Sequence, residues 1–333
     1  MDNDSNIRAV ALLSGGLDSQ VAVKMILDQG VAVTALKFTS PFCTCDSAGV
    51  CHSAVAAKAF GIPLVTIPKG LAYLDVIRSP KHGYGRAMNP CIDCRIFILR
   101  KAKEYAESIG AAFLFTGEVL GQRPMSQHRR ALDIIEEESG LTGKLLRPLS
   151  AKLLPPTDAE RDGIIDREKL GAIQGRSREE QMKRAEEYSI AEYPCAAGGC
   201  LLTDPAFARR LKDLLDNQND VSMRELNLLK VGRHFRYHAA KVIVGRNRSQ
   251  NEHLASIKKK NEVYLESVDI PGPSALVSDA VNDDTIAFAA KALASYSDAV
   301  DQIVTIRISC GTPWTMSVPV DRNTRESIKK WKL

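Results

Sequence analysis

The stretch AVALLSGGLDSQVAVKMILDQG, residues 9–30, decides the fold of the first part of the chain. Its apolar run ends at Ser14-Gly15-Gly16, and apolar positions with helical spacing follow from residue 19. This order predicts a buried strand, a tight turn and a helix. The turn gathers backbone N–H groups at the positive end of the helix dipole, where glycines let an anion approach closely. The stretch therefore predicts a phosphate-binding loop.

The polar residues of this loop limit which ligands it can bind. Ser14 and Ser19 add hydroxyl donors, whereas Asp18 is out of place at an anion site unless a metal ion links it to the phosphates. We therefore expect a nucleotide bound with Mg²⁺. The spacing fits neither the G-x-x-x-x-G-K-[ST] loop nor the dinucleotide loop G-x-G-x-x-G.

Strands and helices alternate over the first 120 residues. This alternation predicts an α/β fold with a doubly wound parallel sheet, whose carboxyl edge is where ligands bind. Lys37 and Phe38 end the second strand, and Thr116 and Gly117 end the fourth, so these residues are candidates for contact with ATP. The predicted strands cover 8–13, 31–38, 63–68 and 111–118, and the helices 19–29, 54–61 and 96–109.

Composition points to an ordinary globular protein of 333 residues with 44% hydrophobic residues and a net charge of +5. A polar N-terminus and the lack of a long apolar run predict a cytoplasmic protein without a membrane partner. The polar stretch 216–220 divides a domain at 1–215, with a helical extension over about 150–215, from an α+β domain at 221–333. Between residues 208 and 260, 13 Lys or Arg stand against 5 Asp or Glu, which suits a phosphate-rich partner or a solvated helical face.

Seven of the eight cysteines fall into three groups, which favours metal or redox chemistry. Cys91 and Cys94 begin a predicted helix, whose dipole lowers thiol pKa values. Together with Cys200, or with Cys195 instead, they can hold an iron–sulfur cluster that leaves one iron open to hydrosulfide. A four-cysteine zinc site and a cluster-free pair that carries a persulfide are the alternatives. The third group, Cys43, Cys45 and Cys51, fits a second metal site, a flap near the nucleotide or a structural role.

The motifs SGGLDS and NPCIDCR together resemble the tRNA thiouridine synthases of the PP-loop ATP pyrophosphatase superfamily. Longer stretches look like a subgroup similar to 4-thiouridine synthases. The segment from about 241 to 314, with VIVGRNRSQNEHL and DIPGPSALV, resembles an NFACT-type RNA-binding domain. Because the loop begins by residue 14, we expect no ferredoxin-like or THUMP region, so the second domain takes over RNA capture. The longer stretches are TGEVLGQRPMSQ (116–127), RPLSAKLLPPT (147–157), GRSREEQ (175–181) and AAGGCLLTD (196–204).

This resemblance implies an ATP-dependent tRNA sulfurtransferase. A uridine carbonyl is adenylated with release of pyrophosphate, and sulfur then displaces AMP. The implied cofactors are ATP, Mg²⁺ and a [4Fe-4S] cluster, and the implied partners are tRNA and either sulfide or a persulfide donor protein. Asp18, Cys91, Cys94 and Cys200 are the implied catalytic residues. The target uridine and the oligomeric state stay open.

Several polar residues are expected to contact RNA or phosphate, and Phe235 and Tyr237 either stack on bases or pack in a strand. Two other functions fit the same motifs. One is a PP-loop enzyme that forms amides or makes a deazaguanine-type product, and the other is a non-enzymatic RNA-binding redox sensor. The polar candidates are Gln122, Arg123, Arg147, Arg176, Arg178, Arg246, Asn247, Arg248, Asn251 and Lys258 to Lys260.

Overall fold

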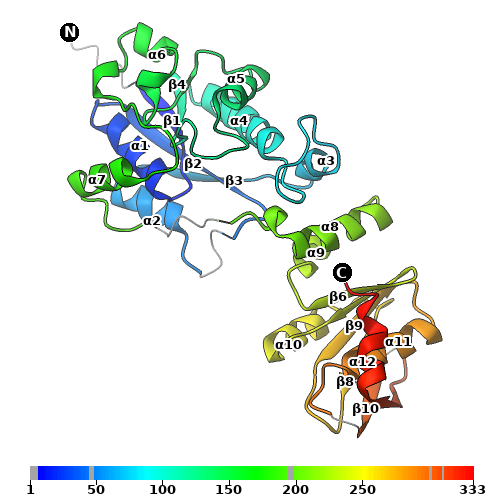
Figure 1. The fold of residues 1–333 in the computed structure, drawn as a ribbon. Coiled ribbons are helices and arrows are strands. Elements are labelled where there is room, and N and C mark those ends of the chain that lie inside the picture. The colour runs from blue at the N-terminus through cyan, green and yellow to red at the C-terminus, as the bar shows by residue number, and fades with distance from the viewer. Residues whose placement is uncertain (1–6, 45–48, 194–198, 300–301, 310) are drawn as a thin grey trace. The chain divides into compact units, whose positions relative to one another are not determined.

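The computed structural model describes residues 7–44, 49–193, 199–299, 302–309 and 311–333. The chain forms two compact units, Met1–Pro205 and Ala206–Leu333 (Figure 1). The expected division at 216–220 lies inside the second unit, because helix α8 (Pro205–Asn217) is tied to that unit. Asp213 of α8 accepts a hydrogen bond of 2.8 Å from Arg236.

The first unit is built on a five-stranded parallel sheet with the order β3-β2-β1-β4-β5. The expected fold class is confirmed, with strand ends within a few residues of the predicted ones. Since β4 joins the sheet on the opposite side of β1 from β2, the order reverses between β1 and β4, and such a switch point opens a ligand crevice. The strands are β1 (Arg8–Leu12), β2 (Ala32–Thr39), β3 (Leu64–Pro68), β4 (Phe113–Thr116) and β5 (Leu145–Leu146).

Helices cover both faces of this sheet because successive β1 side chains point in opposite directions. Ala9 and Ala11 pack with α1 (Leu17–Leu27), α2 (His52–Ala59) and α7 (Glu179–Glu187). Val10 packs on the other face. The helices on that face are α4 (Cys91–Ser108) and α5 (Arg129–Glu138).

Shorter elements complete the unit. Within the expected helical extension, the charged segment 159–190 is helical only in parts. Its charged composition does not provide a continuous apolar stripe, so most of it crosses the surface as turns. The short elements are α3 (Tyr73–Arg78), α6 (Asp158–Arg161), η1 (Ala151–Leu153), η2 (Arg167–Lys169) and η3 (Leu201–Thr203).

The second unit is an α+β domain, as expected, with an antiparallel six-stranded sheet in the order β11-β10-β8-β9-β7-β6. One sheet face packs on α11 (Asp283–Ala294) and α12 (Arg322–Lys329), and the other meets α9 (Met223–Leu228) and α10 (Arg248–Ser256). No helix of the described segments is long and apolar enough to span a membrane. The strands are β6 (Arg233–Tyr237), β7 (Ala240–Val244), β8 (Val263–Ser267), β9 (Ser274–Asp279), β10 (Gln302–Ser309) and β11 (Trp314–Val320).

Candidate active site

The loop between β1 and α1 has the shape that its glycines predict. Gly15 has φ +78°, and a Cβ there would lie 2.5 Å from the backbone carbon of His52, so this position excludes any side chain. Gly16 is the N-cap of α1, which leaves the first N–H groups of the helix without helical partners. Ser19 donates a hydrogen bond of 2.8 Å to the carbonyl of Gly16 and fixes the turn. The loop is therefore a rigid cradle of backbone donors.

The end of β4 presses against the same loop. A Cβ on Gly117 would lie 2.6 Å from the backbone carbon and oxygen of Asp18 and from the Cα of Ser19. Its neighbour Thr116 is buried and donates to Glu118 at 3.2 Å. The residue that follows β4 is thus in direct backbone contact with the first turn of α1.

Asp18 is surrounded by polar side chains from distant segments. Gln122 donates to its Oδ2 at 3.2 Å, and Arg178 Nη2 lies 3.9 Å from its Oδ1. Burial raises the pKa of Asp18, while Arg178, Gln122, Arg123 and Gln181 oppose that rise. The buried Oδ1 has no hydrogen-bond partner, and neither polar atom of the Gln181 amide has one. Unpartnered buried polar atoms beside a phosphate-type loop indicate a place for a ligand.

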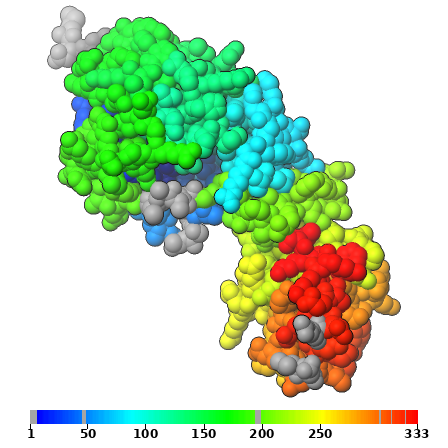
Figure 2. Space-filling view, viewed as in Figure 1, coloured from blue at the N-terminus to red at the C-terminus, as the bar shows by residue number. Residues whose placement is uncertain are grey.

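Arg123 connects this group with the cysteines. Its guanidinium group interacts electrostatically with both Asp18 and Cys91. Desolvation and the nearby Arg95 lower the pKa of Arg123, and the acidic groups oppose that change. In Figure 2 the dark-blue N-terminal part of the unit is visible in a recess between the green and cyan parts.

A buried ion-pair network lies next to Asp18 and Cys91. Arg95 lies 3.3 Å from Glu118, and Arg147 contacts Glu118 at 3.3 Å and Glu136 at 2.7 Å. Burial by itself would raise the pKa of Glu118, but the two arginines hold it below its ordinary value. Arg147 is 3% exposed and committed to this network, so it has a structural role instead of the expected phosphate contact.

Four thiols lie in one neighbourhood at the carboxyl edge. Cys91 and Cys94 occupy the first turn of α4, and Cys43 pairs with Cys200 in an antiparallel bridge. Burial raises the pKa of Cys200 to about 11, with Cys94 and Cys43 adding to the rise. Burial and Cys94 also raise the pKa of Cys91. These mutual effects mean that the thiols are close enough to resist joint ionisation without a cation.

Lys69 and Tyr73, which belong to no sequence motif, contact or influence the thiols. Lys69 donates to Cys94 Sγ at 3.1 Å and lies 4.2 Å from the centre of the Tyr73 ring. Burial and Cys94 raise the pKa of Tyr73. Their only sequence signal is their place after β3, at the same sheet edge. Among the described residues, no set of three His, Cys, Asp or Glu side chains has the geometry of a formed metal site.

The remaining candidates of the first unit have varied positions. Lys37 is buried and donates to Cys51 Sγ at 3.0 Å, which joins the third cysteine group to β2. Phe38 packs partly buried under the α4 side of the sheet, and Arg176 is exposed. The expected residues Cys45 and Cys195 lie outside the described residues.

In the second unit the expected RNA contacts separate into two kinds. Arg246 and Arg248 are exposed, and Lys259 forms a 3.3 Å ion pair with Glu225. Lys258 is half-buried and Lys260 is exposed. Two asparagines serve the fold: Asn247 caps α10, and the Asn251 side chain accepts a 3.1 Å hydrogen bond from Ser274 N–H.

The β6 aromatics pack within their own domain, Phe235 in the core and Tyr237 partly buried against it, as the strand-packing alternative expects. Phe235 is fully buried. The Tyr237 ring stacks on Phe288 with centroids 4.2 Å apart. Their basic neighbour Arg236 is paired with acidic groups of its own unit.

Comparison with known proteins assigns both units. Residues 5–152 match the family described as "Thiamine biosynthesis protein (ThiI)". The first unit is therefore similar to the ThiI family over these residues. That family uses ATP through a PP-loop, and the fold of the first unit is of the PP-loop type, so we refer to Ser14–Ser19 as the PP-loop. Residues 232–332 match the NFACT protein RNA binding domain and make the second unit an RNA-binding domain of that type.

Curated relatives of this chain include the tRNA-specific 2-thiouridylase MnmA of Listeria monocytogenes serotype 4a (strain HCC23). It is 27% identical over 246 residues, which cover 70% of this chain and 62% of the relative. MnmA of Streptococcus agalactiae serotype III (strain NEM316) is 32% identical over 128 residues, covering 35% of this chain and 34% of the relative. The chain thus spans less than two thirds of the relatives' own length.

Two solved structures are also similar. One is described as a 4-thiouridine synthetase–RNA complex with bound ATP (24% identity, TM-score 0.36, covering 68% of this chain and 53% of that one). The other is the U34-tRNA thiolase NcsA from Methanococcus maripaludis with its [4Fe-4S] cluster (18% identity, TM-score 0.35, covering 67% and 70%).

Proposed function

We propose that this chain is an ATP-dependent tRNA sulfurtransferase, which adenylates a uridine carbonyl and replaces its oxygen with sulfur. One observation carries the proposal: Arg95, one turn beyond Cys91 in α4, lies 3.3 Å from Glu118, and the adjacent Gly117 packs directly against the backbone of Asp18 in the PP-loop. The groups for ATP chemistry and for sulfur chemistry therefore lie at one edge of the sheet. The thiouridylase relatives support this reading.

The PP-loop side of the site has the groups that adenylation needs. The uridine oxygen attacks the α-phosphorus of ATP and pyrophosphate leaves, so negative charge builds up on the phosphates. The first-turn N–H groups of α1, with Arg123 and Arg178, stabilise that charge. Mg²⁺ fits beside Asp18, since its Oδ1 is buried without a hydrogen-bond partner. Asp18 would hold the ion, which would stabilise the negative charge that builds up on the phosphates.

The thiol side fits a [4Fe-4S] cluster by its donor chemistry. Cys91, Cys94 and Cys200 would hold the cluster as thiolates, with Cys195 as the alternative third ligand. Burial and the neighbouring thiols raise the pKa of Cys91 and of Cys200, so these two thiols stay protonated at neutral pH until a cation compensates their charge. When bound, such a cluster supplies an iron that can take up hydrosulfide. Lys69, which donates to Cys94, positions that thiol.

In the second step, hydrosulfide attacks the activated carbon of uridine, the carbon–oxygen bond breaks and AMP leaves with that oxygen. Arg123, which interacts electrostatically with Asp18, would help to neutralise the departing phosphate. The second unit supplies RNA affinity through exposed Arg246 and Arg248. The sulfur comes from sulfide or a persulfide donor protein, and we place the reaction in the cytoplasm.

Anaerobically purified full-length protein provides the test. Its visible spectrum and its iron and zinc content are recorded, and the protein is then incubated with ATP, Mg²⁺, sulfide and bulk tRNA. Mass spectrometry of the digested nucleosides should detect a thiouridine, with one AMP formed for each. Cys94→Ser should abolish the product, whereas Cys51→Ser, a matched thiol loss, should keep at least part of it.

Three outcomes contradict the proposal. A loaded cluster with no thionucleoside contradicts sulfur transfer. Zinc in place of iron contradicts the cluster. Pyrophosphate release that survives Cys94→Ser and does not depend on RNA indicates a different PP-loop reaction.

A further inference from the structure

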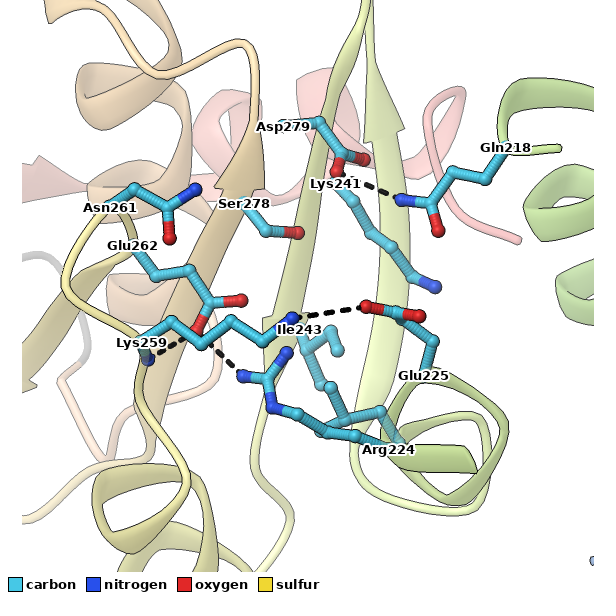
Figure 3. A pocket seen from close by; sticks show the side chains of 11 residues that line it. Gln218, Arg224, Glu225, Lys241, Ile243, Lys259, Asn261, Glu262, Ser278 and Asp279 are labelled. Atoms are coloured by element: carbon cyan, nitrogen blue, oxygen red, sulfur yellow. Dashed lines mark hydrogen bonds and ion pairs between the residues drawn. The ribbon is translucent and has the colours of Figure 1, made fainter. Parts of the chain in front are cut away.

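The second unit contains a cavity of about 110 Å³ on the sheet face that meets α9 (Figure 3). Its floor is formed by β7 and β9, through Lys241, Ile243 and Ser278. Its walls come from Arg224 and Glu225 of α9 and from the segment that holds Lys259 and Glu262. Of the predicted basic stretch 258–260, Lys259 therefore lines the cavity, which the sequence alone does not reveal.

Lys241 is the unusual member of this lining. It is 3% exposed in the middle of β7, and within the described part of the chain no hydrogen bond or ion pair reaches its ammonium group. Its cross-strand neighbours are Arg236, which carries the same charge, and Ser278. In Figure 3 its ammonium group points into the space between Gln218 and Glu225. A buried ammonium group without an ion-pair partner lowers the stability of the fold, so we expect it to interact with a ligand that offsets this loss.

The carboxylates of the cavity do not supply that partner, because their own cations hold them. Glu262 accepts from Arg224 at 2.6 Å and from the Lys259 N–H at 2.8 Å. Glu225 pairs with Lys259 Nζ at 3.3 Å. Asp279 accepts from Arg236 at 3.0 Å and from Gln218 at 3.1 Å. The ammonium of Lys241 is thus the cation of the cavity left without an ion pair in the described residues.

We propose that this cavity is a phosphate-binding site in which Lys241 receives one backbone phosphate of RNA. The inference rests on the proposed function for its ligand, since it takes the RNA-binding domain to act on tRNA. A phosphate presents acceptor oxygens to an ammonium and to the Ser278 hydroxyl, and the cavity is large enough to hold the group. Burial and Arg236 lower the pKa of Lys241 to about 8, and a bound phosphate would reverse that change.

The test measures tRNA affinity of the full chain over a series of KCl concentrations. Lys241→Met should weaken binding about three- to tenfold and reduce the slope of log K on log[KCl] by about 1, as the loss of one phosphate contact does. The matched control is Lys291→Met, which removes an exposed charge from α11 on the opposite face of the sheet and should leave both quantities unchanged. Lys241→Arg should keep the slope.

Unfolding measurements distinguish a ligand-binding role of Lys241 from a purely structural role. Since Lys241 lacks a partner, Lys241→Met should unfold at the same urea concentration as the wild type or a higher one. Inorganic phosphate should raise the melting temperature of the wild type above that in chloride at equal ionic strength, and should not do so for Lys241→Met. If the Met variant does not fold, Lys241→Gln replaces it in both measurements.

The possible failures are distinguishable. Wild-type binding of tRNA with no effect of Lys241→Met on affinity or slope overturns the phosphate site and leaves the proposed function standing. If the wild type does not bind tRNA, the proposed action on tRNA is overturned. The melting-temperature measurement with inorganic phosphate then tests by itself whether the cavity binds phosphate. Equal stabilisation of both proteins by phosphate overturns the site.

Discussion

Gly117 offers the sharpest test of the idea that β4 and the PP-loop form one rigid unit. Its φ is not in the left-handed region, so alanine is compatible with the backbone and the only new element in Gly117→Ala is the Cβ. That atom would lie 2.6 Å from the backbone of Asp18 and Ser19, and normal contact needs at least 3.4 Å. Because the atoms it meets are backbone, the first turn of α1 has to move as a whole.

The size of the effect follows from this displacement. Overpacking of this kind costs about 1–3 kcal/mol of unfolding free energy. A shift of about 1 Å in groups that hold a reacting phosphate lowers the rate about 100-fold. We therefore expect Gly117→Ala to remain folded, with a lower urea midpoint and a much larger loss of activity than of stability.

The assay is tRNA-dependent release of pyrophosphate, measured beside urea unfolding on the same preparations. Gly85→Ala is the matched control, since its new Cβ would meet mainly the flexible Met125 side chain, at 3.2 Å, and it should behave like the wild type. A Gly117→Ala protein with wild-type stability and wild-type pyrophosphate release would refute the claim that β4 sets the position of the loop.

Four further predictions follow from individual side chains. Asp18→Asn should lower pyrophosphate release at least about 100-fold and should raise the urea midpoint at pH 7 or leave it unchanged. Burial raises the pKa of Asp18, so its ionisation above the unfolded-state pKa opposes folding. A clear loss of stability would contradict this. In metal-free protein, Cys43→Ser should speed the alkylation of Cys200 at pH 9, measured by peptide mass spectrometry, since Cys43 helps to raise the pKa of Cys200 to about 11; an unchanged rate would place Cys43 outside the thiol group. Arg236→Met should lower the unfolding free energy of the second unit by about 3 kcal/mol in urea unfolding, because it leaves Asp213 and Asp279 without their largely buried partner. Loss of the exposed Arg248 should leave this free energy unchanged. Affinity of the wild type for tRNA should fall between pH 7 and pH 9 as Lys241, with a pKa of about 8 among Arg236, Asp213, Asp279 and Glu225, loses its proton, and Lys241→Arg should remove this dependence; a flat wild-type profile would count against the phosphate site.

Several buried polar side chains have atoms without hydrogen-bond partners within the described residues, and two such side chains lie beside the PP-loop. These are Asp18, through Oδ1, and the Gln181 amide, while Lys241 makes no ion pair in the cavity of the second unit. Glu118 Oε1 and Arg147 Nη2 also lack hydrogen bonds, but they belong to the ion-pair network of Glu118 with Arg95 and Arg147. Proteins keep such incomplete sites at a cost in stability, which a bound ligand offsets.

Much of the fold was predictable because its signals are local. The apolar run before Ser14 and the helical spacing after residue 19 set β1, the loop and α1 from adjacent residues. The same holds for β7 at KVIVG and for most of α11. The segment 159–190 was harder, since charged composition alone does not distinguish helices from ordered turns.

The sequence by itself determined the two domain types, the PP-loop and the cysteine pairs, since each depends on residues close together along the chain. Only the tertiary structure brought Gln122, Arg178 and Gln181 to Asp18, placed Cys43 beside Cys200, and buried Lys241 among carboxylates that are already paired. These contacts join segments tens to more than a hundred residues apart. Spacing along the chain carries no information about them, because strand order and side-chain packing decide which distant residues share an edge.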